Sequence, residues 1–182
     1  MYIQTEETPN PNALKFLPGK TVLKTGTIFI SNKEDAIRSP LARKLFNIAH
    51  VEAVFLGSDF ITVTKAEQAR WEILKPMILT EVMDYYVTGE VLESEDKKPE
   101  VTYDDSDPII KQIVELIETR VRPAVAMDGG DIIFKGFNQG IVQLELHGSC
   151  SGCPSSSATL KDGIENMLKH YVPEVVAVEA VA

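Results

Sequence analysis

The stretch Gly148-Ser149-Cys150-Ser151-Gly152-Cys153-Pro154-Ser155-Ser156 holds the only two cysteines of the 182-residue chain. A segment that alternates apolar and polar residues precedes it, and a segment whose apolar residues recur at helical spacing follows it. Two cysteines cannot form a disulfide framework for a chain of this size. The CxxC pair therefore predicts metal or redox chemistry in a loop between a strand and a helix.

The residues around this loop predict a small α+β domain over 108–182. Asp107-Pro108 supplies a helix cap and a first-turn proline, and the apolar residues that follow repeat at helical spacing. Gly140 lies in the turn expected between two strands. The expected elements are, in chain order, a helix that Pro123 ends or bends, a hairpin over 132–137 and 141–147, the cysteine loop, a helix over about 155–171 and a strand over 175–178.

Residues 1–89 predict a second compact α+β domain. Pro9-Asn10-Pro11-Asn12 is a strong turn signal, and Ser39-Pro40 marks the start of a short helix. His50 is interpreted as structural or solvated, and this domain alone indicates no function. The expected strands cover 2–6, 13–17, 27–30, 51–56 and 60–64, and a longer helix covers about 67–87, with Pro76 either causing a kink or lying near the helix start.

The segment 90–107 is expected to be an acidic, flexible linker between the two domains. It carries eight acidic residues against only Lys97 and Lys98, which gives −6 of the chain's net charge of −9. Low apolar content combined with charge of one sign opposes folding into a packed core. An acidic docking segment is the alternative interpretation.

Composition also limits the partners and the location. No basic patch is present, so nucleic-acid binding is not expected. No apolar run reaches the ~18 residues that a membrane-spanning helix needs. The first residues, from Met1 to Glu7, resemble neither a secretion signal nor a transit peptide. We therefore expect a cytoplasmic protein, or a mitochondrial matrix protein whose presequence has been removed.

Cys150 and Cys153 lie just before the N-terminus of the expected helix. A helix N-terminus favours negative charge, so we expect it to lower the pKa of the two thiols. The neighbouring glycines and serines are expected to leave space around the sulfurs and to keep backbone N–H groups free to donate to them. Such a pair can form a reversible disulfide, half of a tetrahedral zinc site, or half of the ligands of an iron–sulfur cluster.

The two metal hypotheses require ligands that one chain does not supply. The sequence has no second cysteine pair, so a second copy of the chain or external thiols must complete the site. A cluster held at a symmetric dimer seam should be easier to release than one enclosed by a single chain, which favours a carrier. A thioredoxin-like thiol–disulfide oxidoreductase normally has a βαβ context, and here a hairpin precedes the motif. That oxidoreductase and a zinc-bridged dimer remain the alternatives.

Three further residues are weaker candidates for the site. Strand alternation places His147 on the polar face of its strand, so we expect it to lie outside the site. Asp128 and Asp131 flank Gly129-Gly130 and are either metal ligands or parts of a sharp helix-to-strand turn. We favour the turn, because paired glycines allow backbone conformations that other residues avoid.

These motifs together resemble the NifU-like (Nfu) iron–sulfur scaffold proteins. In the C-terminal half the resemblance rests on Asp128-Gly129-Gly130-Asp131, on Gly148 to Ser156 and on Thr159-Leu160-Lys161-Asp162-Gly163-Ile164. In the N-terminal half it rests on Thr8 to Phe16, on Arg38-Ser39-Pro40-Leu41-Ala42 and on Asp59-Phe60-Ile61-Thr62-Val63-Thr64. It covers both domains and omits only the linker.

The resemblance implies a carrier and not an enzyme. It implies a [4Fe-4S] cluster bound at a homodimer interface by Cys150 and Cys153 of each subunit. The implied partners are the upstream cluster-assembly machinery and apo-protein recipients such as lipoyl synthase, aconitase and respiratory-chain subunits. It also implies that the N-terminal domain assists partner recognition.

Overall fold

The computed structural model describes residues 1–88, 107–152 and 154–181. The chain divides into two compact units, Met1–Lys98 and Pro99–Ala182, each with its own sheet and its own hydrophobic core. The expected α+β class is therefore confirmed. Most of the proposed linker lies outside the described residues. Its last residue, Asp107, belongs to the second unit, where it caps a helix.

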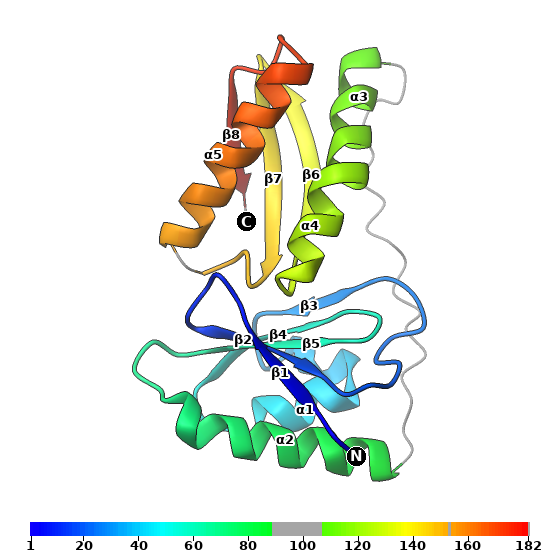
Figure 1. Cartoon of the computed structure of the whole chain (residues 1–182), viewed down its shortest axis with the longest axis vertical. Coiled ribbons are helices and arrows are strands. Elements are labelled where there is room, and N and C mark those ends of the chain that lie inside the picture. The colour runs from blue at the N-terminus through cyan, green and yellow to red at the C-terminus, as the bar shows by residue number, and fades with distance from the viewer. Residues whose placement is uncertain (89–106, 153, 182) are drawn as a thin grey trace. The chain divides into compact units, whose positions relative to one another are not determined.

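The first unit contains an antiparallel five-stranded sheet (Figure 1). Its strand order is β1-β2-β5-β4-β3, so β1 and β3 form the two edges. The hairpin of β4 and β5 is close to its expected position, and β1 begins two residues later than expected. The strands are β1 (Gln4–Glu7), β2 (Ala13–Leu17), β3 (Ile28–Ile30), β4 (Val51–Leu56) and β5 (Ile61–Lys65).

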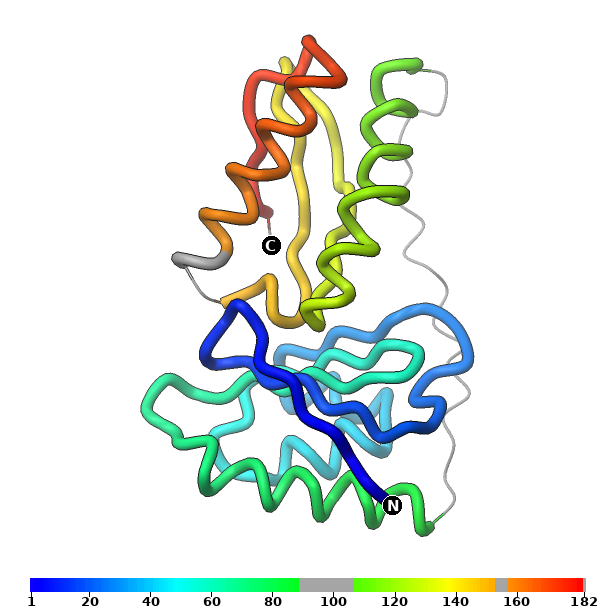
Figure 2. The backbone as a smooth tube through the Cα atoms, viewed as in Figure 1, coloured from blue at the N-terminus to red at the C-terminus, as the bar shows by residue number. Residues whose placement is uncertain are grey.

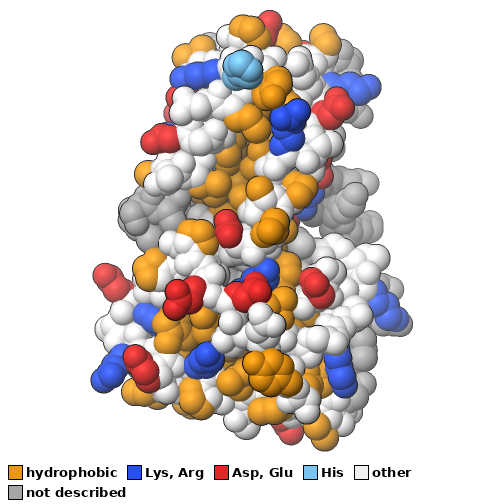
Figure 3. All heavy atoms as spheres, in the orientation of Figure 1, with side chains coloured by type: hydrophobic (Ala, Val, Ile, Leu, Met, Phe, Trp, Pro, Cys, Tyr) orange, Lys and Arg blue, Asp and Glu red, His pale blue; other side chains and the backbone are white. Residues whose placement is uncertain are grey.

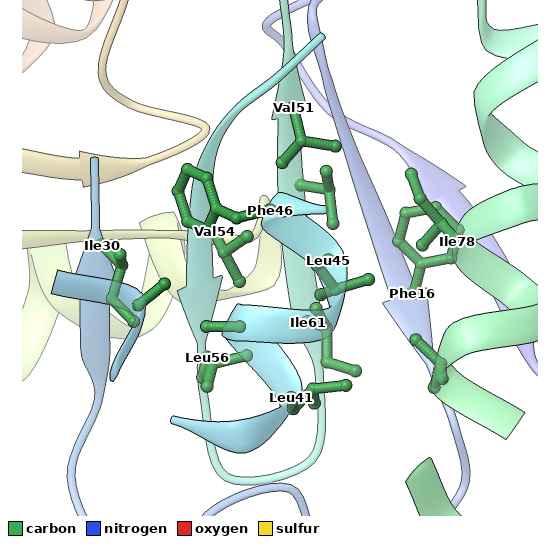
Figure 4. Packing of buried hydrophobic residues seen from close by; sticks show 14 of the residues in the cluster. Phe16, Ile30, Leu41, Leu45, Phe46, Val51, Val54, Leu56, Ile61 and Ile78 are labelled. Carbon is green, nitrogen blue, oxygen red and sulfur yellow. The ribbon is translucent and has the colours of Figure 1, made fainter. Parts of the chain in front are cut away.

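Two helices share the apolar core of this sheet, as Figure 4 shows. A short 3-10 turn, η1 (Asp35–Arg38), precedes α1 (Pro40–Phe46). The expected cap of α1 is confirmed, because the Ser39 side chain accepts a hydrogen bond from Ala42 N at 3.1 Å. Leu41 and Leu45 of this helix are fully buried.

The second helix of this unit, α2 (Trp71–Thr88), starts later than the sequence predicts and continues through Pro76. Its buried side carries Leu74, Ile78, Val82 and Tyr85. Proline has no N–H, so it removes one intrahelical bond. Packing of an apolar face supplies most of a helix's stability in a protein, so a long buried face can tolerate this loss.

The second unit consists of helices and a three-stranded sheet of order β6-β7-β8 (Figure 2). Strands β6 and β7 pair antiparallel, whereas β7 and β8 pair parallel through the crossover helix α5. The elements are α3 (Pro108–Leu116), a π-helical turn η2 (Ile117–Val121), α4 (Arg122–Met127), β6 (Gly130–Asn138), β7 (Ile141–Gly148), α5 (Pro154–Tyr171) and β8 (Ala177–Val181).

The first helix of this unit does not end at Pro123, which was one of the two predicted outcomes. The chain widens into the π-turn η2 just before this residue and continues through it as α4. A π-turn before a proline rearranges the backbone hydrogen bonds where the proline lacks an N–H. At the start of α3, the Asp107 carboxylate accepts from Ile109 N at 2.8 Å, which confirms the expected cap.

One face of the sheet in this unit is packed against the helices. Ile132, Phe134, Val142, Leu144 and Val178 are buried in this core with residues of α3, η2 and α5. Figure 3 shows apolar side chains between the helices of this unit. Among the described helices of the chain, none is long and apolar enough to cross a membrane.

Candidate metal centre

The cysteine loop joins the end of β7 to the start of α5, as the sequence predicts (Figures 1 and 2). Gly148, the last residue of β7, pairs with Gly130, the first residue of β6. The loop therefore begins beside the turn that joins α4 to β6. This turn contains Asp128-Gly129, and Gly129 adopts a positive φ of 77°, which glycine reaches without strain.

Hydrogen bonds from Ser149 attach the loop to this turn. Ser149 Oγ donates to the Asp128 carbonyl at 2.6 Å, and Ser149 N donates to the Gly129 carbonyl at 3.2 Å. The Ser149 side chain is only 2% exposed. The two segments on which the sequence resemblance rests are thus joined in space, although 21 positions separate Asp128 from Ser149.

The backbone N–H groups of the described part of the loop are used within the domain. Cys150 N donates to the His147 carbonyl at 3.3 Å, and Ser151 N donates to the Gly148 carbonyl at 3.1 Å. On the other side, Ser157 Oγ in the first turns of α5 donates to the Cys150 carbonyl at 2.9 Å. The N–H groups of Ser149, Cys150 and Ser151 are therefore not free to donate to sulfur, contrary to the expectation for this loop.

Cys150 is buried, with 6% of its surface exposed, and belongs to the core of the second unit. A Cβ atom at Gly130 would lie 2.3 Å from Cys150 Sγ and 3.1 Å from Cys150 N. The sulfur therefore fills the place that a side chain at residue 130 would occupy. The absence of a side chain at Gly130 is thus what makes room for the sulfur.

Burial raises the pKa of the Cys150 thiol from 9.0 to about 12. A hydrogen bond with Ser149 lowers this pKa, and the negative charges of Asp128 and Asp131 raise it further. Desolvation disfavours the charged thiolate, and here its effect is larger than any stabilisation by the following helix. The expected lowering of the Cys150 pKa is therefore wrong for the metal-free chain.

Cys153 lies outside the described residues, so only the position of Cys150 is described, and the assignment of both cysteines as ligands stays a prediction. Among the residues that the structure describes, no group of three or more His, Cys, Asp or Glu side chains could hold a metal ion. In the described part of a single chain, Cys150 is therefore not part of a complete set of metal ligands.

Asp131 is engaged in an ion pair that the sequence did not reveal. Arg122 donates to both of its carboxylate oxygens, from Nε and from Nη2, each at 2.8 Å. Asp131 Oδ1 also accepts from Ile132 N at 2.8 Å, and the residue is 4% exposed. The preference for a structural turn over a metal site agrees with this geometry. Nothing in the sequence around Arg122 indicates that this residue pairs with a carboxylate nine positions later.

His147 lies on the same strand face as Gln143 and Glu145, as strand alternation predicts. Its Nε2 lies 2.8 Å from Glu145 Oε1, and Glu145 Oε2 also pairs with Lys135 Nζ at 2.6 Å. The buried residues Val142 and Leu144 point to the opposite face, toward the core. In the first unit, His50 is exposed with a positive φ of 71°, in agreement with its solvated interpretation.

Comparison with known proteins identifies both units. Residues 3–89 match the family described as "Scaffold protein Nfu/NifU N terminal", and residues 113–179 match the "NifU-like domain". The two domains define an iron–sulfur cluster scaffold. The chain belongs to the Nfu/NifU family, which consists of scaffold proteins and not of enzymes.

Two relatives extend this similarity over the whole chain. The protein named "NFU1 iron-sulfur cluster scaffold homolog, mitochondrial" from Homo sapiens is 53% identical over 183 residues, which cover 100% of this chain and 72% of the human protein. "NifU-like protein 4, mitochondrial" from Arabidopsis thaliana is 51% identical over 98% of this chain and 65% of its own length. The solution structure of a NifU-like protein from Saccharomyces cerevisiae is 32% identical, with a TM-score of 0.47 over 53% of this chain and 87% of that chain.

Proposed function

We propose that this chain carries a [4Fe-4S] cluster as cargo, held by Cys150 and Cys153 of two subunits. The observation that supports this most directly is the position of Cys150. Hydrogen bonds from Ser149, Ser151 and Ser157 hold its loop, and Gly130 makes room for its sulfur. In the described part of the chain, no group of three or more ligating side chains surrounds it. A four-thiolate cluster then requires the same pair from a second copy.

The state of Cys150 suggests how cargo would be taken up and released. In the metal-free chain the thiol is neutral and buried, which protects it from oxidation, because the thiolate is the reactive form. Binding iron requires the thiolate, so loading releases a proton and turns the sulfur outward from the core. Loss of the cluster lets the thiol return to its place beside Gly130, and this return favours release.

The partners follow from this role. The chain would accept the cluster from assembly machinery and pass it to apo-proteins, with lipoyl synthase, aconitase and respiratory-chain subunits as candidates from the family resemblance. The location would be a compartment with such machinery, either the bacterial cytoplasm or the mitochondrial matrix. The two relatives described above are named as mitochondrial proteins.

Anaerobic reconstitution of the full chain tests the proposal. We expect a brown dimer with roughly four iron and four sulfide per dimer. Cys150→Ser and Cys153→Ser should each abolish the cluster and the dimer that depends on it. His147→Gln is the matched control, because its side chain pairs with Glu145, and it should retain full iron and sulfide content.

Two other results would contradict the proposal. A stable, colourless dimer that contains zinc and no sulfide would indicate a structural metal site. Reduction of insulin disulfides by the metal-free monomer at a rate typical of thioredoxins would indicate an oxidoreductase. The Cys150 pKa of about 12 argues against the second result, because an attacking thiol works best with a pKa near the ambient pH.

A further inference from the structure

A groove of about 590 Å³ lies in the N-terminal domain, far along the sequence from the cysteine loop. It lies between the edge strand β1, the β1–β2 loop and the first turns of α2. On the face of the domain where β1 and α2 lie, apolar side chains are interspersed with charged ones (Figures 1 and 3). The lining includes Thr5 and Glu7 of β1, Pro9 and Pro11 of the loop, and Trp71 and Lys75 of α2.

The walls of this groove are fixed before any partner binds. Thr8 Oγ1 donates to the carbonyls of Asn10 and Ala13 at 2.8 and 2.9 Å, and Asn12 N donates to Asn10 Oδ1 at 2.9 Å. Trp71 Nε1 donates to the Pro11 carbonyl at 3.0 Å, which joins the helix to the loop. A preformed site loses less conformational entropy on binding than a mobile one does.

On the α2 side the groove lining carries one charged residue, Lys75, and a second lysine, Lys65, lies outside the lining but close to the Trp71 ring. Lys65 is 6% exposed, and its Nζ donates to Asn12 Oδ1 at 2.9 Å and to two backbone carbonyls, with no carboxylate among these partners. The same Nζ lies 5.8 Å from the centroid of the Trp71 ring. Within the described chain, Lys75 also has no carboxylate partner.

The β1 side offers a backbone edge and one negative charge. Because β1 is the edge of the five-stranded sheet, a further strand can pair with it. Thr5 and Glu7 are in register with Phe16 and Leu14, which face the core beneath the helices. Alternation then directs every second side chain of an added strand to the same face of the sheet, where Lys75 lies.

We propose that this groove binds an extended, acidic segment of a partner protein, which adds to β1 as a further strand. An acidic side chain of that segment pairs with Lys75, near the buried charge of Lys65, and an apolar side chain packs on Trp71. The identification of the partner as a recipient of the cluster rests on the proposed function. The binding itself does not, because the groove lies wholly in the N-terminal domain.

Trp71 makes the test direct, because it is the only tryptophan of the chain. The probe is a capped Val-Thr-Glu-Thr-Val-Thr peptide, in which valine and glutamate share one face of an added strand, titrated into the metal-free full chain while Trp71 emission is recorded. We expect a saturable change with this peptide and none with its lysine counterpart. A version methylated on alternate backbone nitrogens should also fail to bind, since it lacks the main-chain donors of a strand.

Two single substitutions in the groove should change the affinity for the peptide in opposite directions. Lys75→Gln should weaken peptide binding about two- to five-fold, and Glu7→Gln should strengthen it by a similar factor, because each removes a single charge that is at least partly exposed to solvent. Lys33→Gln removes an exposed charge outside the groove and should leave binding unchanged.

Three outcomes would overturn the proposal. They are equal binding of the lysine peptide, full binding of the methylated peptide, and a Trp71 emission that responds to salt but to no peptide. Because the metal-free chain is used, none of these outcomes depends on whether Cys150 and Cys153 hold a cluster.

Discussion

Gly130 is required by the sulfur that lies against it and not by its backbone angles. A Cβ atom at this position would meet Cys150 Sγ at 2.3 Å, and it would meet Cys150 N and the His147 carbonyl at 3.1 Å. Two of these neighbours are backbone atoms, so the strand and the loop would have to separate. The position therefore couples the first residue of β6 to the geometry of the cysteine loop.

Gly130→Ala should accordingly destabilise the C-terminal domain by about 1–3 kcal/mol, as overpacking does in a filled core. The measurement is urea unfolding of the metal-free chain followed by far-ultraviolet circular dichroism. Gly163→Ala is the control, because Gly163 lies inside α5 with open space around its Cβ position. This control should stabilise the domain by roughly 0.5–1 kcal/mol. Equal effects of the two substitutions would show that Cys150 does not occupy the place described.

The raised pKa of Cys150 predicts an unusual alkylation profile. In Cys153→Ser, Cys150 is the only thiol, so iodoacetamide reports on it alone. The thiolate reacts, and a pKa raised by burial means that the thiol stays protonated above its ordinary value of 9.0. The rate should be low at pH 8 and should keep rising toward pH 11.

The same variant in denaturant supplies the reference for this profile. Unfolding removes the burial, so the rate should level off near pH 9. A folded-state profile that levels below pH 9 would mean that the helix N-terminus controls the thiol, as the sequence alone suggested.

At the scale of single residues, the sequence predicted local hydrogen bonds better than it predicted burial. The caps at Ser39 and Asp107 were predictable, because each depends on a side chain and a backbone N–H only two or three residues apart. The burial of Cys150 was not, because it depends on Gly130, which is twenty positions away and carries no side chain. Local chemistry can be read from the chain, whereas desolvation requires the fold.

Between elements, the Arg122–Asp131 pair fixes the end of the first helix against the first strand of the sheet. Arg122 lies in the first turn of α4, and Asp131 is the second residue of β6. Arg122 also pairs with Glu118 at 2.9 Å, so the pair continues into the π-turn η2. Hydrogen bonding to Asp131 holds the pKa of Arg122 well above its usual range, although burial opposes this shift.

Arg122→Ala should destabilise the C-terminal domain by about 2–4 kcal/mol, because it leaves the buried Asp131 carboxylate without its cation. This expected loss of stability is smaller than that for a fully buried ion pair, since the Arg122 side chain is 32% exposed. Adding Asp131→Asn should recover part of the loss in the same unfolding experiment. Lys169→Ala, which breaks the exposed pair with Glu165, is the control and should have a much smaller effect.

The elements were predicted well where the pattern is periodic, and the first-turn prolines Pro40 and Pro108 were also predicted. Inside helices the outcome was harder to predict, because α2 continues through Pro76 and a π-turn precedes Pro123. In α2 the buried face of Leu74, Ile78 and Val82 continues past the proline. The sequence shows that a proline removes a hydrogen bond, but packing decides whether the helix continues.

At the scale of the molecule, the two apolar cores contain no residue in common. The order of domains was accessible from the sequence, because charge and apolar content change sharply after residue 89. The scaffold family was accessible because Cys150 and Cys153 lie within about a dozen residues of Asp162 in a recognisable motif. The groove beside Trp71 could not be predicted from the sequence, because its walls come from β1, from the β1–β2 loop and from α2, which lies more than fifty residues later.

Separate cores predict that damage to one domain leaves the other intact. Trp71 emission reports on the N-terminal domain alone, and iron and sulfide content reports on the cysteine loop. Leu45→Ala removes a fully buried side chain from the first core, so it should cost about 2–5 kcal/mol and lower the urea midpoint of Trp71 emission. Its reconstituted iron and sulfide should stay at the level of the unaltered chain.

Gly130→Ala should give the reverse pattern. It should lower the unfolding midpoint of the C-terminal domain and leave the Trp71 midpoint unmoved, because Cys150 and its neighbours belong to the second core. A shift of both midpoints in either variant would mean that the domains unfold as one cooperative unit. In that case the cluster site would depend on the N-terminal domain for stability, and partner binding in the groove beside Trp71 would stabilise the cysteine loop as well.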